Sequence, residues 1–273
     1  MSEVNLIGIT EPNYKYTGCE TAEELVAWAA RVSNPSNQNN TKTAARLVQY
    51  LIRNQHWSPL EMVHVSMEIK TTRDIARQIL RHRSFSFQEY SQRYADPTKD
   101  LGYELREARL QDQKNRQNSI DNEDRALQEE WDAHQSSIVR AARDAHAWAT
   151  SKGIAKEQAR SVLPEGNTES VMIMSGSLRS WVHYCQLRMD KATQKEHRIV
   201  AEQCWEIVCL HFPDIKIAID QIEQQKKQPL LRLAYYINSL MEGDTHNIDK
   251  MYAYMRELGL VDEDGYLLDE ETT

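Results

Sequence analysis

The sequence lacks the features of several large protein classes. It has no apolar run near the roughly 20 residues that a transmembrane helix needs, and no basic segment followed by an apolar core at its N-terminus. The four cysteines, Cys19, Cys185, Cys204 and Cys209, form no CxxC pair and no zinc-ligand spacing. The chain also has no Walker loop, no GxGxxG motif and no internal repeat. We therefore expect a cytoplasmic protein with reduced thiols, no metal site and no membrane partner.

The composition is that of a globular domain. Of the 273 residues, 40% are hydrophobic and 27% are charged, which is enough to bury a substantial core. The net charge is −8, whereas general nucleic-acid binders usually carry a basic footprint. This balance argues against nucleic acid as a partner, but it is compatible with a small anion that local cations hold.

Cations gather against this acidic background in residues 73–94. Arg73, Arg77 and Arg81 are four residues apart, so they share one face if the segment is helical. Arginine binds phosphate and carboxylate through a planar fork of donors. The stretch therefore predicts an anion site, although a solvated basic helix would show the same pattern.

The period of the pattern changes after the arginines. Residues 84–87 alternate polar and apolar side chains, which is typical of an extended segment. If the extension continues, Glu89, Ser91 and Arg93 point to the same side of the chain. An acceptor, a hydroxyl and a guanidinium on one side could hold a nucleotide, and the simpler alternative is an ordinary strand.

The same stretch resembles the signature of an enzyme family. Residues 81–93 match the RHRxxSxxxxSxR motif of flavin-dependent thymidylate synthases, with the two motif serines at Ser86 and Ser91. The resemblance extends over about residues 29–209 and leaves the C-terminal tail outside. It implies reductive methylation of dUMP to dTMP, with methylenetetrahydrofolate as the carbon donor and NADPH as the reductant through bound FAD. It also implies a homotetramer whose active sites are shared between subunits.

The resemblance further implies which residues bind each ligand. The residues implied for dUMP are Gln78, Ile79, Leu80, Arg81, Glu89, Tyr90, Ser91, Gln92, Arg93, Arg160 and Arg188. Those implied for FAD are Ser58, Arg81, His82, Arg83, Glu89, Ser177, Leu178, Arg179 and His183. Arg188 is the implied catalytic residue, because a guanidinium at the uracil edge would stabilise charge that develops on the ring. Ser91 is expected to bind the nucleotide rather than attack it, because no base is suitably spaced beside it.

Two positions depart from the family pattern. Ala192 and Thr193 stand where the family often has a histidine, and His183 stands where many members have asparagine. These departures bear on flavin affinity. Two alternatives therefore stay open, a non-enzymatic nucleotide- or RNA-binding protein and a flavoprotein of the same fold that has lost dUMP methylation.

Periodicity predicts an α+β fold, with a mostly antiparallel or mixed sheet flanked by helices. Strands are expected at residues 4–9, 63–72, 103–110 and 171–177, and helices at residues 25–32, 41–53, 123–151, 154–164, 178–187 and 194–212. The expected inner face of the longest helix is Leu127, Trp131, Ile138, Ala142, Ala145 and Trp148. We expect one domain over residues 1–227 and a helical C-terminal extension over residues 228–273 that ends in an acidic run.

Overall fold

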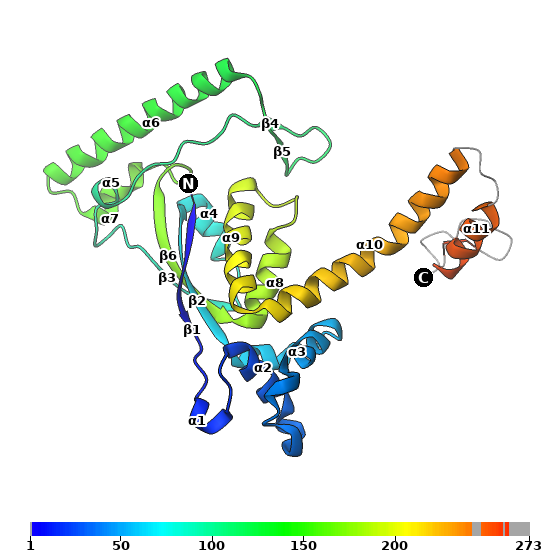
Figure 1. The fold of residues 1–273 in the computed structure, drawn as a ribbon. Coiled ribbons are helices and arrows are strands. Elements are labelled where there is room, and N and C mark those ends of the chain that lie inside the picture. The colour runs from blue at the N-terminus through cyan, green and yellow to red at the C-terminus, as the bar shows by residue number, and fades with distance from the viewer. Residues whose placement is uncertain (1, 242–246, 259, 262–273) are drawn as a thin grey trace.

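A four-stranded antiparallel sheet forms the centre of the protein (Figure 1). The computed structural model describes residues 2–241, 247–258 and 260–261. The strand order is β1-β2-β6-β3, with β1 at Glu3–Ile9, β2 at His64–Thr72, β3 at Phe85–Glu89 and β6 at Glu169–Ser177. Because β6 pairs antiparallel with both β2 and β3, those two strands run parallel to each other on either side of it. The predicted α+β fold is confirmed.

The sheet buries one face, as the alternation of β2 predicts. Val65, Met67 and Ile69 are fully buried, whereas the side chains between them are only half-buried. Trp181 packs into the same core and donates its indole N–H to the carbonyl of Val65 over 2.9 Å. This bond fixes the helix that carries Trp181 against the sheet.

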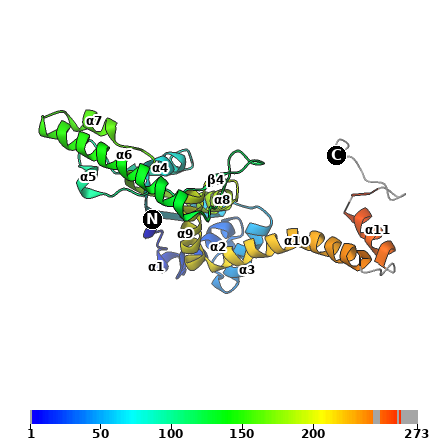
Figure 2. The same ribbon diagram turned by 90° about the horizontal axis from the view of Figure 1, so that it is seen from above.

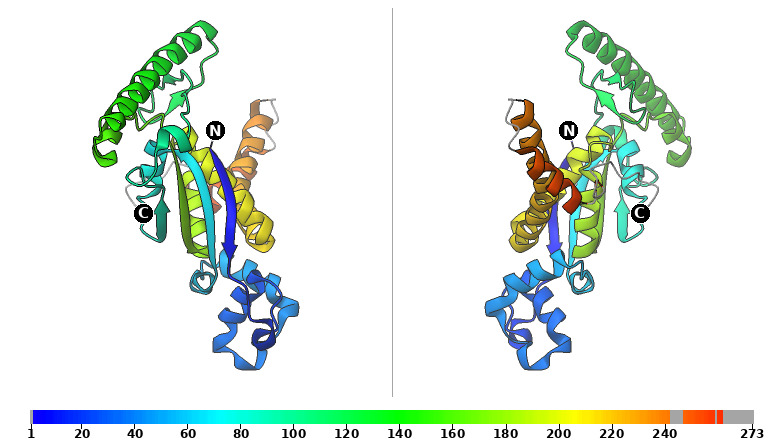
Figure 3. Two further views of the ribbon diagram at one scale, coloured as in Figure 1. Left: turned by 90° about the vertical axis from the view of Figure 1, so that its left-hand side faces the viewer. Right: turned by 90° about the vertical axis from the view of Figure 1, so that its right-hand side faces the viewer.

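Helices account for most of the chain. They are α1 (Tyr14–Thr17), α2 (Ala22–Ala30), α3 (Ala44–Arg53), α4 (Arg73–Ile79), α5 (Pro97–Asp100), α6 (Arg125–Ser151), α7 (Lys156–Ala159), α8 (Leu178–Arg188), α9 (Lys195–His211), α10 (Pro213–Met241) and α11 (Ile248–Glu257). A capping box is present at the start of α2, where Thr21 accepts the N–H of Glu24 over 3.1 Å. Helices α4, α8 and α9 cover the buried face of the sheet, and in the left view of Figure 3 they lie behind the strands. No helix in the described part of the chain is both long and apolar enough to span a bilayer.

Two long helices project from the body in opposite directions (Figure 2). Helix α10 is anchored by Ile215 and Ala218 and packs against α11, where the Arg232 guanidinium lies 4.2 Å from the ring centroid of Tyr254. The expected boundary at residues 227 and 228 falls inside α10, so one continuous helix links the two expected units. The division into domain and extension stays a prediction, and the acidic run lies outside the described residues.

Helix α6 was predicted correctly in extent but wrongly in orientation. Trp131, Ile138 and Trp148 are 41%, 56% and 59% exposed, and Leu127 and Ala145 are also exposed. Of the expected inner face only Ala142 is buried, together with the unexpected Gln135, His146 and Ala149. The reason is a polar tether, because the Gln135 amide accepts the N–H of Arg106 over 2.8 Å and donates to its carbonyl over 2.9 Å. The polar stripe of α6 therefore faces the segment that carries Arg106, and the apolar stripe faces outward.

The expected strand at residues 103–110 is largely wrong. Only Tyr103 forms a bridge, with Thr168, and the end of the segment forms β4 (Leu110–Gln111), which pairs with β5 (Ser119–Ile120). In between, the backbone N–H groups bond to the carbonyl of Asn167 and to the side chain of Gln135 instead of to a neighbouring strand.

Candidate active site

The implied ligand-binding residues fall into three groups along the sheet. We call them the Ser177 group, at the end of β6; the Arg188 group, between α4, α8 and α9; and the Glu89 group, at the end of β3. Strand β6 separates the first from the third, because its nine residues span about 26 Å at about 3.3 Å per residue.

The Ser177 group forms where β6 turns into α8. It contains Ser58, Glu61, Ser177, Leu178, Arg179 and His183. Ser177 is the N-cap of α8 and accepts the N–H of Ser180 over 3.3 Å. Glu61 lies in the 3-10 helix Ser58–Met62, which packs against α8, and its carboxylate accepts a bond from Arg179 over 2.7 Å.

Electrostatics in the Ser177 group keep Glu61 ionised. Its hydrogen bond with the Ser177 hydroxyl, and the nearby Arg179, hold the pKa of the Glu61 carboxyl below its usual value. His183 stacks edge-on against Trp57 with ring centroids 4.6 Å apart. Burial and then Arg179 lower the pKa of His183, so the imidazole is neutral. The side chain of Leu178 is fully buried, which leaves only its backbone for a ligand.

The Arg188 group centres on a guanidinium that a histidine holds. Arg188, at the end of α8, donates its Nε–H to His82 Nε2 over 2.8 Å. Burial, and then Arg188 and Arg81, lower the pKa of His82 to about 4. A neutral imidazole has one lone pair free, so His82 can accept this bond at neutral pH.

The end of α4 differs from the expectation for Arg81. The helix stops at Ile79, and the N–H of Arg81 bonds to the Gln78 carbonyl in a turn that leads to β3. The prediction that Arg81 shares a helical face with Arg73 and Arg77 is therefore wrong. Ile79 is fully buried, so the chain must turn after it to reach the edge of the sheet.

The turn that follows α4 exposes two further cations of the motif. Arg81 and Arg83 are exposed, and neither pairs with a carboxylate among the described residues. Leu80 packs partly into the core, so that it and Ile79 could reach a ligand mainly through their backbones.

Sequence reasoning missed a buried polar chain behind Gln78. The amide of Gln78 donates to Gln194 Oε1 over 2.8 Å and its oxygen lies 3.3 Å from His197 Nδ1, while His197 Nε2 lies 3.2 Å from the Tyr184 hydroxyl. A signal was available for His197, because it occupies the apolar stripe of α9 that Val200, Ala201 and Cys204 continue.

The Glu89 group is a network of ions at the other end of the sheet. Arg73 and Arg77 bond to the two carboxylate oxygens of Glu89 over 3.4 and 3.2 Å, and Ser170 donates to Glu89 over 2.9 Å. Arg73 and Arg77 do share one face of α4, as predicted. Beside them is a cavity of about 410 Å³ whose lining includes Gln92 and Arg160.

The segment after Glu89 is not extended, contrary to the prediction for Ser91 and Arg93. Tyr90 still bonds to the carbonyl of Val171, near the start of β6, but Ser91 then begins a turn. The N–H of Arg93 bonds back to the Ser91 hydroxyl over 3.4 Å. The strand ends here although β6 continues to Glu169, because the chain turns away from β6 after the Tyr90 bond and Tyr94 N–H bonds back to the Ser91 carbonyl.

The side chains around this turn differ in how many of their polar atoms form hydrogen bonds. Gln92 is 4% exposed and its amide nitrogen has no hydrogen-bond partner among the described residues. Tyr90 donates to Asp100 over 2.8 Å, and burial and this bond raise the pKa of its phenol. Arg93 is exposed, and Arg160 is half-buried at the start of the 3-10 helix Arg160–Val162. Gln92 and Arg160 therefore leave unused donors at the cavity.

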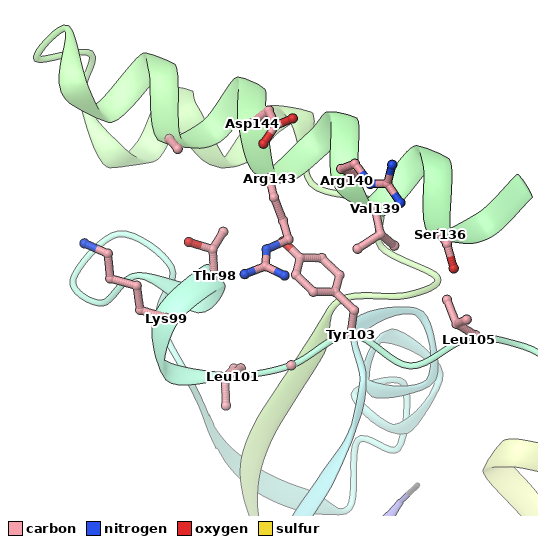
Figure 4. Close-up of a pocket in the computed structure, with 12 residues that line it drawn as sticks. Thr98, Lys99, Leu101, Tyr103, Leu105, Ser136, Val139, Arg140, Arg143 and Asp144 are labelled. Carbon is pink, nitrogen blue, oxygen red and sulfur yellow. The ribbon is translucent and has the colours of Figure 1, made fainter. Parts of the chain in front are cut away.

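A larger cavity, of about 700 Å³, contains none of the implied residues (Figure 4). It lies between α6 and residues 98–105, and Arg143 points from α6 to within 5.9 Å of the ring centroid of Tyr103. No group of three or more His, Cys, Asp or Glu side chains in the described ranges is arranged to hold a metal ion.

Comparisons with known proteins show which family the chain belongs to. Residues 15–214 match the family described as thymidylate synthase complementing protein. A probable flavin-dependent thymidylate synthase of Paramecium bursaria Chlorella virus 1 is 46% identical over 217 residues, which cover 80% of this chain and 98% of that protein. A flavin-dependent thymidylate synthase of Synechocystis is also 46% identical, over 80% of this chain and 99% of its own.

A solved structure shares the fold. The UMP/dUMP methylase PolB from Streptomyces cacaoi, bound with 5-Br dUMP, superposes with a TM-score of 0.68 over 81% of this chain and 95% of its own, at 24% identity. The fold, the motif at the β3 edge and the two relatives that match along nearly their whole lengths converge on one conclusion. The chain belongs to the thymidylate synthase complementing protein family, that of the flavin-dependent thymidylate synthases.

Proposed function

We propose that this protein methylates dUMP reductively to dTMP, with methylenetetrahydrofolate as the carbon donor and NADPH as the reductant through bound FAD. The observation that carries the proposal is the Arg188 guanidinium held by a neutral histidine, 2.8 Å away, beside the exposed Arg81. Carbon 5 of uracil attacks an electrophile only when negative charge can develop on the ring. A fixed guanidinium at the N3 and O4 edge stabilises that charge.

The Ser177 group fits the flavin. The N-terminus of α8, an 11-residue helix, together with Arg179, offers donors to an anion. Arg81 and Arg83 offer two more cations without a described carboxylate partner. Ser58, His82, Ser177, Leu178, Glu89 and His183 complete the proposed FAD site. Bound FAD supplies the hydride, because no protein side chain can.

The Glu89 group fits the sugar and phosphate of dUMP. Arg160 and the buried, unpartnered amide of Gln92 line its cavity, and Ser91 and Arg93 follow the same strand. Arg73 and Arg77 neutralise Glu89, so the carboxylate does not repel an incoming phosphate as strongly as a free one would. Gln78, Ile79, Leu80 and Tyr90 complete the proposed dUMP site.

A homotetramer with shared sites is part of the proposal. The cavity beside Glu89 is lined by neither Arg188 nor Gln78, so the proposed dUMP contacts of one chain are divided between two places. A second copy could complete each half. The outward apolar stripe of α6, with Trp131, Ile138 and Trp148, offers a surface for such contact.

The compartment and the alternatives follow from two further observations. We propose a cytoplasmic location, since the described cysteines are free and three of them are buried. The match to enzymes over four fifths of the chain disfavours a non-enzymatic nucleotide- or RNA-binding protein. A flavoprotein that has lost dUMP methylation would bind FAD but form no dTMP.

The visible absorbance spectrum, recorded with and without dUMP, tests the proposal. We expect the bands of an oxidised flavin, a shift of those bands on adding dUMP, and dTMP formation when the folate and NADPH are present. A colourless protein that takes up no added FAD would contradict the proposed function.

Mixing two inactive variants tests the shared sites. If Arg188 and Arg160 of one site come from different subunits, a mixture of Arg188→Ala and Arg160→Ala chains should regain activity in about one quarter of its sites. The control is a chain with both substitutions, mixed with either single variant, because it cannot rebuild an intact site. No recovery after subunit exchange would argue against sharing.

A further inference from the structure

Behind the proposed nucleotide site runs a continuous chain of five polar side chains. It begins at the hydroxyl of Tyr184, passes through His197, Gln78 and Gln194, and ends at the carboxylate of Glu196. Tyr184, His197 and Glu196 are 1%, 0% and 8% exposed, so water is largely excluded from these three side chains, while Gln78 and Gln194 are half-buried. The Gln194 amide donates to Glu196 over 2.9 Å.

The carboxylate fixes the direction of every bond in the chain. An ionised carboxylate only accepts, so Gln194 must turn its NH₂ toward Glu196 and its oxygen toward Gln78. Gln78 must then donate to Gln194 and turn its own oxygen toward His197. An amide oxygen only accepts, so His197 Nδ1 carries the hydrogen, and Nε2 accepts from the Tyr184 hydroxyl.

The end of the chain is firmly anchored. Burial alone would raise the pKa of Glu196, but hydrogen bonds from Arg109 and Gln194 outweigh it, and the pKa lies below its usual value. Burial and the nearby Arg188 lower the pKa of His197 to about 3, so the imidazole stays neutral at physiological pH. Neither end of the chain can reverse its role without leaving a buried group unpaired.

We propose that His197 is a positioning residue that, with Gln194, locks the amide of Gln78 so that its unused N–H, and not its carbonyl oxygen, is offered to the nucleotide. This rests on the proposed function, in which Gln78 is one of the residues that complete the dUMP site. A phosphate oxygen accepts hydrogen bonds and repels a carbonyl oxygen. A Gln78 amide that was free to rotate by half a turn would spend part of its time in the repelling orientation.

His197→Leu breaks the chain and His197→Asn repairs it. The asparagine amide nitrogen occupies nearly the place of Nδ1 and can donate to Gln78, whereas leucine cannot. The dissociation constant of dUMP is measured from the shift it causes in the flavin absorbance bands, and turnover is measured separately at saturating dUMP. His134→Leu, on the exposed side of α6 where its only described ion pair is to Glu130, is the matched control.

We expect His197→Leu to raise the dissociation constant of dUMP about three- to tenfold, the equivalent of one neutral hydrogen bond. Turnover at saturating dUMP should change by less than about twofold, because the hydrogen-bonded chain affects dUMP binding and not the reaction at the uracil ring. His197→Asn should recover most of the affinity, and His134→Leu should match the wild type.

Two outcomes would contradict the proposed positioning role of His197. One is an unchanged dissociation constant in a folded His197→Leu protein, and the other is an equal loss in the leucine and asparagine variants, which would indicate a purely structural role. If the leucine variant does not fold, Tyr184→Phe removes the hydroxyl that donates to His197 Nε2 and should weaken dUMP binding about twofold; no change would also contradict the proposed role of His197. A wild-type protein without flavin bands would contradict the proposed function. A wild-type protein with flavin bands and dUMP binding, together with a His197→Leu variant of unchanged dUMP affinity, would contradict only the positioning role of His197.

Discussion

His82 gives a direct test of how the chain holds the Arg188 guanidinium. The substitution His82→Leu removes the acceptor that lies 2.8 Å from Arg188 Nε. Arg188 is half-buried, so we take the lower end of the range for a hydrogen bond to a charged group, about 1.5 kcal/mol. This corresponds to about a tenfold loss in kcat/KM. Arg188→Ala removes the donor to the developing charge itself and should cost about 10²- to 10³-fold in kcat.

The two substitutions should not add. If His82 acts on the ring through Arg188, the double variant should be no slower than Arg188→Ala alone. The assay is tritium release from dUMP labelled at C5, since methylation replaces that hydrogen. Saturating FAD separates this effect from any contact of His82 with the flavin, and His82→Gln, which keeps an acceptor, is the matched control. Independent, multiplying losses, or an Arg188→Ala enzyme within about threefold of the wild type, would refute the reasoning.

Three further outcomes concern stability. The pKa of His197 is lowered to about 3, so below pH ~6.5 His197 is protonated in the unfolded chain but not in the folded one. Urea titrations should therefore show the free energy of unfolding falling as the pH drops from ~6.5 toward ~3, and falling less steeply in His197→Leu. Burial, and then Asp214, raise the pKa of Glu23 to about 8, so stability should fall as pH rises from ~4.5 to ~8, and Glu23→Gln should melt higher than the wild type at pH ~8. Gly176→Ala would press a methyl group into the ring of Phe85, which also packs against Trp181. We expect urea unfolding to show a loss of about 1–3 kcal/mol in stability. An unchanged unfolding midpoint would contradict the prediction in each of these three cases.

Structure is predicted most accurately from the sequence where a local residue pattern alone determines the secondary structure. The alternation of residues 63–72 predicts β2 almost residue for residue, since the strand runs from His64 to Thr72. The Arg81 and Ser91 predictions are wrong because each extends a regular element beyond the residue at which it ends. Helix α4 ends at Ile79, and the chain turns away from β6 after Tyr90 although β6 continues to Glu169.

Long-range polar contacts are harder to predict. The apolar stripe of α6 suggests an inner face, but Gln135 binds the backbone of Arg106, 29 positions earlier, and turns the helix over. His197 meets Gln78 across 119 positions. Such pairs depend on where the fold brings two distant segments, and no local period records them. The motif at residues 81–93 was informative because it resembles a family signature, which fixes residue types at set positions and does not depend on periodicity.

The position of β6 also constrains how the chain folds during synthesis. Strands β2 and β3 do not pair with each other; β2 can pair early with β1, but β3 finds its neighbour only in residues 169–177. A ribosome must therefore make about two thirds of the chain before the segment with the signature arginines has a backbone partner. Until then Phe85 and Phe87 sit on an unpaired strand edge, which makes the nascent chain dependent on chaperones or on fast elongation through this interval. Slowing translation between β3 and β6 should lower the yield of folded protein more than slowing it after α8.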